Sequence, residues 1–105
     1  MTFEDLKKLP LLQTRGIAAT ITDDKTMNYV MSCLARFFTG DYGLIDPEDT
    51  DANNLDLESG YGHVLAKYGQ FGTLEGDFYI ESHFDRDYLN DVNYSQTMIM
   101  YPHER

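Results

Sequence analysis

Hydrophobic residues recur at three- and four-residue spacing most clearly between residues 25 and 38. This period matches one face of an α-helix, so it predicts a helix over 25–38 that packs this face into the core. Asp23 or Asp24 can cap its start, and Gly40 is well placed to end it. The residues on the apolar face are Met27, Val30, Met31, Leu34, Phe37 and Phe38.

Two further segments are typical of helices. Residues 2–9 place Phe3, Leu6 and Leu9 on one face and stop at Pro10. A second helix is predicted from Pro47 to about Glu58, with Asp46 as N-cap, Pro47 at the first position and Gly60 or Gly62 at its end. In this second helix we expect Ala52 and Leu55 to face inward. Residues 14–21 fit a helix or a strand equally well.

The remaining regular segments are rich in β-branched and aromatic residues and predict strands over 61–68, 77–84 and 94–101. Helices followed by a meander of strands indicate a single α+β domain over residues 1–105. We expect two layers, with the N-terminal helices packed on a three-stranded or slightly larger antiparallel sheet. The core residues expected from these patterns are Leu34, Phe37, Val64, Ile80 and Ile99.

Charge is distributed unevenly along the chain. The formal net charge is -10, and the stretch between Phe37 and Ala66 contains no lysine or arginine. Such a surface attracts basic partners and disfavours direct contact with nucleic acid. The partner-binding residues predicted here are seven carboxylates with two tyrosines that add contact area: Asp41, Asp46, Glu48, Asp49, Asp51, Asp56, Glu58, Tyr42 and Tyr61.

No catalytic constellation is visible, and we expect neither enzymatic activity nor a cofactor. Asp49, Asp51 and Asn53 have the alternating spacing of a calcium loop, but Asn54 and Gly60 stand where its turn glycine and bidentate glutamate belong. A divalent-metal protein or enzyme that uses His63, His83 and Asp85 is the alternative from a different class. No zinc-binding spacing supports it, so no metal ligand is predicted.

Cys33 is the only cysteine, which suits a reducing compartment. No secretory signal and no membrane-spanning apolar run is present. We therefore expect a cytoplasmic protein that makes no membrane contact.

Several short motifs resemble those of the small "plasmid-related" proteins of bacterial mobile elements and phages. They lie at 14–17 (Thr-Arg-Gly-Ile), 40–43 (Gly-Asp-Tyr-Gly), 48–49 (Glu-Asp) with Asn53 or Asn54, and 65–68. The segments 78–82 and 97–102 look like the last two strands of that family. Tyr42 stands where the family has tryptophan, His63 lies near a family arginine, and 85–93 looks like an insertion.

The resemblance implies a setting among mobile elements, whose small acidic proteins include many inhibitors of host defence. It implies an anti-CRISPR protein that binds a type II CRISPR effector nuclease and blocks its engagement with nucleic acid. Such nucleases hold nucleic acid in basic channels, which an anionic domain could occupy. A plasmid-maintenance protein is the second alternative.

Overall fold

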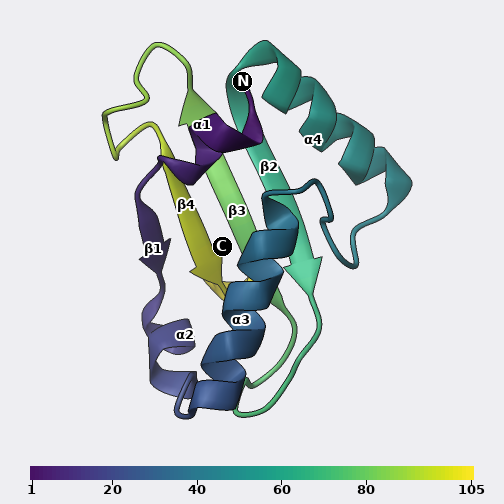
Figure 1. The fold of residues 1–105 in the computed structure, drawn as a ribbon, viewed down its shortest axis with the longest axis vertical. Coiled ribbons are helices and arrows are strands. Elements are labelled where there is room, and N and C mark those ends of the chain that lie inside the picture. Colours follow the sequence, from purple (N-terminus) through teal and green to yellow (C-terminus); the bar gives the residue numbers. More distant parts are fainter.

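A mixed sheet with the strand order β1-β4-β3-β2 forms one layer of the molecule, and helices cover one of its faces (Figure 1). The computed structural model describes all residues from Met1 to Arg105. The α+β, two-layer prediction is therefore confirmed, with four strands in the sheet. The elements are α1 (Phe3–Lys7), β1 (Leu11–Gln13), α2 (Arg15–Thr20), α3 (Asp24–Phe37), α4 (Pro47–Ser59), β2 (Tyr61–Tyr68), β3 (Phe78–Asp85), β4 (Gln96–Met100) and the 3₁₀ helix η1 (Pro102–Glu104).

Side-chain caps start each α-helix. Thr2, Thr14, Asp23 and Asp46 each accept a hydrogen bond from a backbone N–H in the first turn of α1, α2, α3 and α4, respectively. Each cap satisfies a donor that the helix itself leaves unpaired. Gly60 ends α4 in the left-handed region, at φ 84°, which glycine adopts without steric cost. The predicted starts of α3 and α4 are thus confirmed.

The three C-terminal strands form the predicted antiparallel meander, in which Leu65 pairs with Glu81 and Glu81 pairs with Met98. The sequence patterns did not predict β1. It lies parallel to β4, with Leu12 opposite Met98. Residues 14–21, left open between helix and strand, contain α2.

The core lies between α3 and the sheet. Leu34, Phe37, Val64, Ile80 and Ile99 are all buried there, as predicted. The expectation that Met27 and Met31 fill the core was wrong, since they are 42% and 46% exposed. They lie toward the β1 side of α3, where they line an apolar groove between α3 and β1. A strand of only three residues is too short to cover them.

Candidate functional site

Helix α4 lies along the outer edge of β2, and its side chains bond to the backbone of that strand (Figure 1). The Asn53 amide donates to the Leu65 carbonyl at 2.8 Å and accepts from the Leu65 N–H at 3.0 Å. Asp56 Oδ2 accepts from the His63 N–H at 3.1 Å. Ser59 Oγ accepts from the Tyr61 N–H at 3.1 Å, and its hydroxyl lies within donor distance of the Asp56 and Tyr61 carbonyls, at 2.9 and 3.1 Å. Helical side chains here take the place of a neighbouring strand.

The last part of this edge is closed by backbone instead of side chains. The Lys67 N–H donates to the Tyr42 carbonyl at 3.1 Å, and the Leu44 N–H donates to the Lys67 carbonyl at 2.7 Å. Gly43 lies between them at φ 73°, and a Cβ there would collide with the Lys67 carbonyl oxygen. We call this border, where residues 61, 63, 65 and 67 all have outer hydrogen bonds, the sealed edge.

Sealing this edge explains why the inner face of α4 carries polar side chains beside the buried Leu57. Unpaired strand edges invite pairing with other chains, and proteins commonly cover them. Asn53 is only 4% exposed and occupies a position that periodicity would assign to an apolar residue. The expectation that Ala52 and Leu55 face inward was wrong, because Leu55 is 66% exposed and Ala52 is also on the surface.

Three of the seven predicted carboxylates have structural roles. Asp41 forms a two-point ion pair with Arg36, at 2.8 and 3.2 Å, and also accepts from the Gly43 N–H. Hydrogen bonds from Arg36 hold the pKa of Asp41 below its usual range. Asp46 caps α4, and Asp56 bonds to the sealed edge. These contacts account for their positions without any partner.

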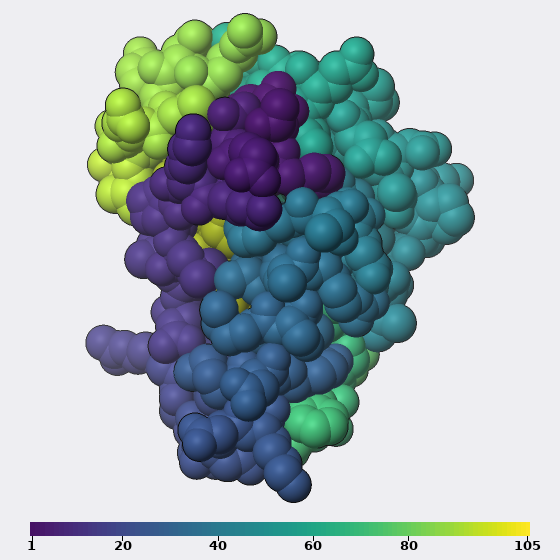
Figure 2. Space-filling model, in the orientation of Figure 1, coloured from purple at the N-terminus to yellow at the C-terminus, as the bar shows by residue number.

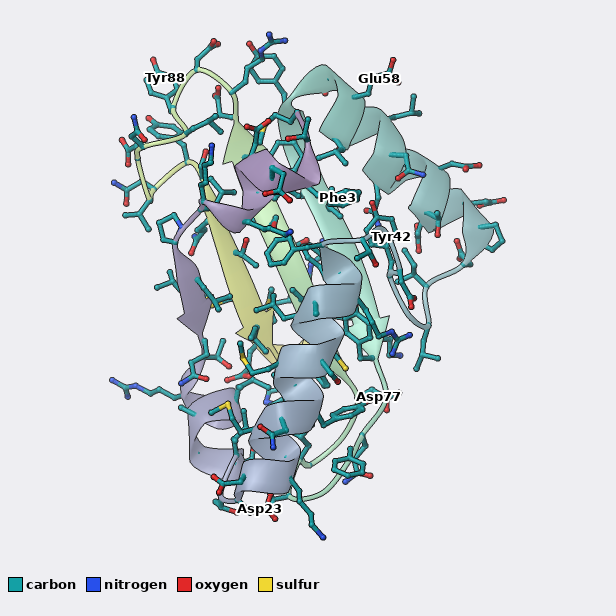
Figure 3. All side chains as sticks on the ribbon, in the orientation of Figure 1. Phe3, Asp23, Tyr42, Glu58, Asp77 and Tyr88 are labelled. Carbon is teal, nitrogen blue, oxygen red and sulfur yellow. The ribbon has the colours of Figure 1, made fainter.

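The other four carboxylates, Glu48, Asp49, Asp51 and Glu58, are exposed on α4 and form no ion pair. Spacings of three and four residues place Glu48, Asp51, Leu55 and Glu58 on the side of the helix opposite Asn53. Figure 3 shows Glu58 pointing away from the sheet. We call Glu48, Asp51, Leu55 and Glu58 the outer stripe. It is an anionic surface with an exposed leucine among its carboxylates.

Tyr42 was expected to be an exposed contact residue, and that expectation was wrong. It is 3% exposed, packs against Phe3 and Phe37, and donates from its hydroxyl to Asn54 at 3.1 Å (Figure 3). Its ring fills the space between three helices. Tyr61, in contrast, is 45% exposed. Its hydroxyl donates to Asp87 at 2.8 Å, and this bond raises the Tyr61 pKa.

The sheet face opposite α3 carries a polar cluster centred on Glu81, which is 1% exposed. Burial alone would raise the pKa of Glu81. Hydrogen bonds from His83, at 2.9 Å, and Arg105, at 2.8 Å, outweigh that effect and lower the pKa to about 2. The bond with Glu81 in turn raises the pKa of His83.

The structure brings His63 and His83 side by side, with ring centroids 5.7 Å apart. His83 nevertheless faces Glu81, while Asp85 accepts from the N–H of Asp87. No group of three or more His, Cys, Asp or Glu side chains lies close enough together to hold a metal ion. His83 belongs to the ion-paired cluster around Glu81, and the His63 side chain forms no ion pair.

The motif segment 14–17 contacts Glu104 of η1 at the end of β1. Glu104 accepts from the Thr14 hydroxyl at 2.6 Å and from the Gly16 N–H at 3.1 Å. A Cβ at position 16 would approach the Glu104 carboxylate to 2.7 Å, so this contact favours glycine. These motif residues have clear roles in holding the fold, and their spacing gave no sign of that contact.

None of the helices combines the length and the apolar content that a membrane span requires. Comparisons with protein-family models, curated proteins and solved structures gave no match to this chain.

Proposed function

We propose that this protein is a non-catalytic inhibitor that binds a basic protein surface through the outer stripe of α4. The observation that carries the proposal is that the carboxylates of this helix fall into two groups, one bonded to the fold and one facing away from it. Asp46 and Asp56 serve the fold, whereas Glu48, Asp51 and Glu58 face away from it without cationic partners. Like charges on one helix face repel one another and lower stability, so their concentration favours a role outside the fold.

The outer stripe combines two kinds of contact that suit a protein interface. Its carboxylates would steer a basic surface toward the helix and fix its orientation. Leu55, with 66% of its surface exposed, would supply an apolar contact in the middle of those charges. Tyr61, which is 45% exposed just after α4 ends, would extend the contact. Asp49 lines a hollow beside Asn53 on the inner side of the helix, and the buried Tyr42 would support the helix through its hydrogen bond to Asn54.

The resemblance to proteins of mobile elements suggests the target class. A type II CRISPR effector nuclease binds nucleic acid in a basic channel. An anionic helix bound at that channel would compete with nucleic acid by occupying its cationic side chains. The inhibitor would act stoichiometrically, and salt would slow its association because it screens the attraction.

The experiment compares two triple variants that change the net charge equally. One replaces Glu48, Asp51 and Glu58 by lysine, and the control replaces Glu4, Asp24 and Glu75, which are exposed elsewhere on the surface. Each is titrated against a guide-loaded type II effector nuclease in a DNA-cleavage assay, and circular dichroism checks folding. We expect the stripe variant to lose inhibition and the control to retain it.

Equal loss in both variants would indicate an effect of net charge alone. Full inhibition by a folded stripe variant would refute the role of the stripe. If the wild-type protein does not inhibit the nuclease, the target is wrong, and a pull-down from host lysate with the same two variants tests the basic-surface contact separately.

A further inference from the structure

The opposite border of the sheet, formed by β1, is unpaired. The Pro10 carbonyl accepts from Thr97, and the Thr14 N–H donates to Ile99, so residues 10, 12 and 14 turn their polar groups toward β4. Because these directions alternate along a strand, Leu11 and Gln13 turn their N–H and C=O groups to solvent. We call this border the open edge. No element lies beyond it (Figure 1).

An apolar groove runs beside the open edge, between β1 and α3. It consists of two adjoining hollows of about 380 and 220 Å³ that share Leu11 and Met31. Figure 2 shows yellow atoms at the bottom of a hollow between the purple N-terminal segment and the blue helix. Strand β4 contributes to the lining of both hollows, with Thr97 in the larger one and Ile99 in the smaller one.

The side chains around this groove are exposed although they are apolar. Leu11, Leu12, Met27 and Met31 have exposed fractions between 39% and 46%. A strand added to the open edge would lie next to Leu11, and its side chains on the α3 side would cover Met27 and Met31. Backbone pairing and apolar burial are therefore available to the same extended ligand.

Charge identifies the kind of ligand. Residues 6–22 contain Lys7, Lys8 and Arg15 and no carboxylate, in a chain whose net charge is -10. Lys7 pairs with Glu4, whereas Lys8 and Arg15, which flank β1 on its two sides, form no ion pair. In an antiparallel pair of two β1 strands, Lys8 of one copy would approach Arg15 of the other, so charge disfavours self-pairing.

We propose that the open edge binds an extended acidic segment of another protein as an additional strand of the sheet. The Leu11 and Gln13 backbone groups would form the pairing. Lys8 and Arg15 would attract carboxylates at the two ends of the segment, and alternate apolar side chains would enter the groove. This contact is independent of the outer stripe, which lies at the other side of the molecule.

The test selects from a phage-displayed library of random nine-residue peptides on the immobilised full chain. We expect enriched peptides to carry net negative charge and alternating apolar residues. They should bind a Gln13→Pro variant about tenfold more weakly, because proline removes an outer N–H and disturbs its neighbour's pairing. Hydrogen exchange by NMR should show that the bound peptide protects the Leu11 and Gln13 amides.

Further variants separate the groove and the charges from any effect of proline on folding. Met31→Glu should weaken the selected peptides, whereas Met31→Leu should retain them because the groove stays apolar. Lys8→Glu should weaken them more than Lys25→Glu, which makes the same charge change at another exposed site.

Three outcomes would overturn the proposal. The first is that no peptide is enriched, and the second is that enriched peptides are basic or bind the Gln13→Pro and Met31→Glu variants unchanged. The third is a dimer in sedimentation experiments that Gln13→Pro dissociates. That result would assign the open edge to a second copy of this chain.

Discussion

The two borders of the sheet have opposite properties, and they are formed by an eight-residue strand, β2, and a three-residue strand, β1. At β2, residues 61, 63, 65 and 67 have outer hydrogen bonds from α4 and from residues 42–44. At β1, Leu11 and Gln13 have none, and exposed apolar side chains lie beside them. The sealed edge carries anionic surface, and the open edge carries lysine and arginine. Because α4 covers β2 through hydrogen bonds from Asn53, Asp56 and Ser59, polar side chains can cover a strand edge as well as apolar ones do.

The largest expected effect comes from introducing a proline at each of the two borders and comparing the losses of stability. Leu65→Pro removes an N–H that bonds to the buried Asn53 amide, and it should lower the free energy of unfolding by about 3 kcal/mol or more. Gln13→Pro removes an N–H that faces solvent on an edge strand, where proline is tolerated, and it should cost about 1 kcal/mol or less. Urea unfolding followed by circular dichroism measures both. Similar losses in the two variants would contradict the difference between the borders.

The next largest effect tests the side chain that seals β2. Asn53→Ala leaves the Leu65 N–H and carbonyl without their partners, so we expect a loss of about 2–4 kcal/mol in unfolding free energy. The matched control is Asn54→Ala, which removes a single hydrogen bond from Tyr42 and should cost about 1 kcal/mol. Hydrogen exchange should also accelerate at Leu65 before it does so at β4. A loss below that of the control would show that Asn53 does not hold this border.

A change of pH should have an intermediate effect on the unfolding free energy, because Glu81 titrates on β3, between the two borders. The Glu81 pKa is lowered from 4.5 to about 2, so its stabilisation is complete above about pH 4.5 and is lost as the pH falls toward 2. This contribution is about 2–3 kcal/mol. The His83 pKa is raised, so its smaller contribution is present below its usual value of 6.5 and is lost as the pH rises through the raised value.

Unfolding free energies measured from pH 2 to 9 in wild type and Glu81→Gln test this assignment. The variant should lack most of the acid-dependent difference, because glutamine does not titrate. Both borders should lose hydrogen-exchange protection together in acid, since Glu81 lies on β3. Identical pH profiles for the two proteins would place the acid sensitivity elsewhere.

The smallest expected effect concerns the outward side of α4. Asp51→Lys and Glu58→Lys should each change the unfolding free energy by no more than about 0.5 kcal/mol, because both side chains are exposed and form no ion pair. Asp56→Ala should cost more, since it removes the bond to the His63 N–H. Thermal unfolding of the three variants provides the comparison. A large loss for Asp51→Lys would give the outer stripe a structural role.

The sequence predicts local features of this fold better than it predicts contacts between distant segments. The α4 cap at Asp46 and its end at Gly60 follow from backbone chemistry within a few residues. The inward side of α4 was predicted wrongly because apolar periodicity assumes packing against an apolar surface. Here the helix meets a strand edge, which requires the hydrogen-bonding side chain of Asn53.

The same limit applies to β1 and to the candidate surfaces. Strand β1 has only three residues, which is too few to show a periodic pattern. It becomes a strand only by pairing with β4, more than eighty positions later in the chain. The acidic segment was visible from composition, but its division into structural and outward carboxylates depends on which residues reach Arg36 or His63. Tyr42 was misplaced for a similar reason, because its burial depends on three helices meeting around it.

The sealed edge also limits how these molecules can polymerise. Growth of a continuous intermolecular sheet requires each subunit to offer two binding borders, one to receive a strand and one to template the next. This fold offers one, so its valence for strand pairing is one. Association through the sheet would end at a pair, whether with a second copy or with another chain, and a fibre could grow only after α4 detached from β2.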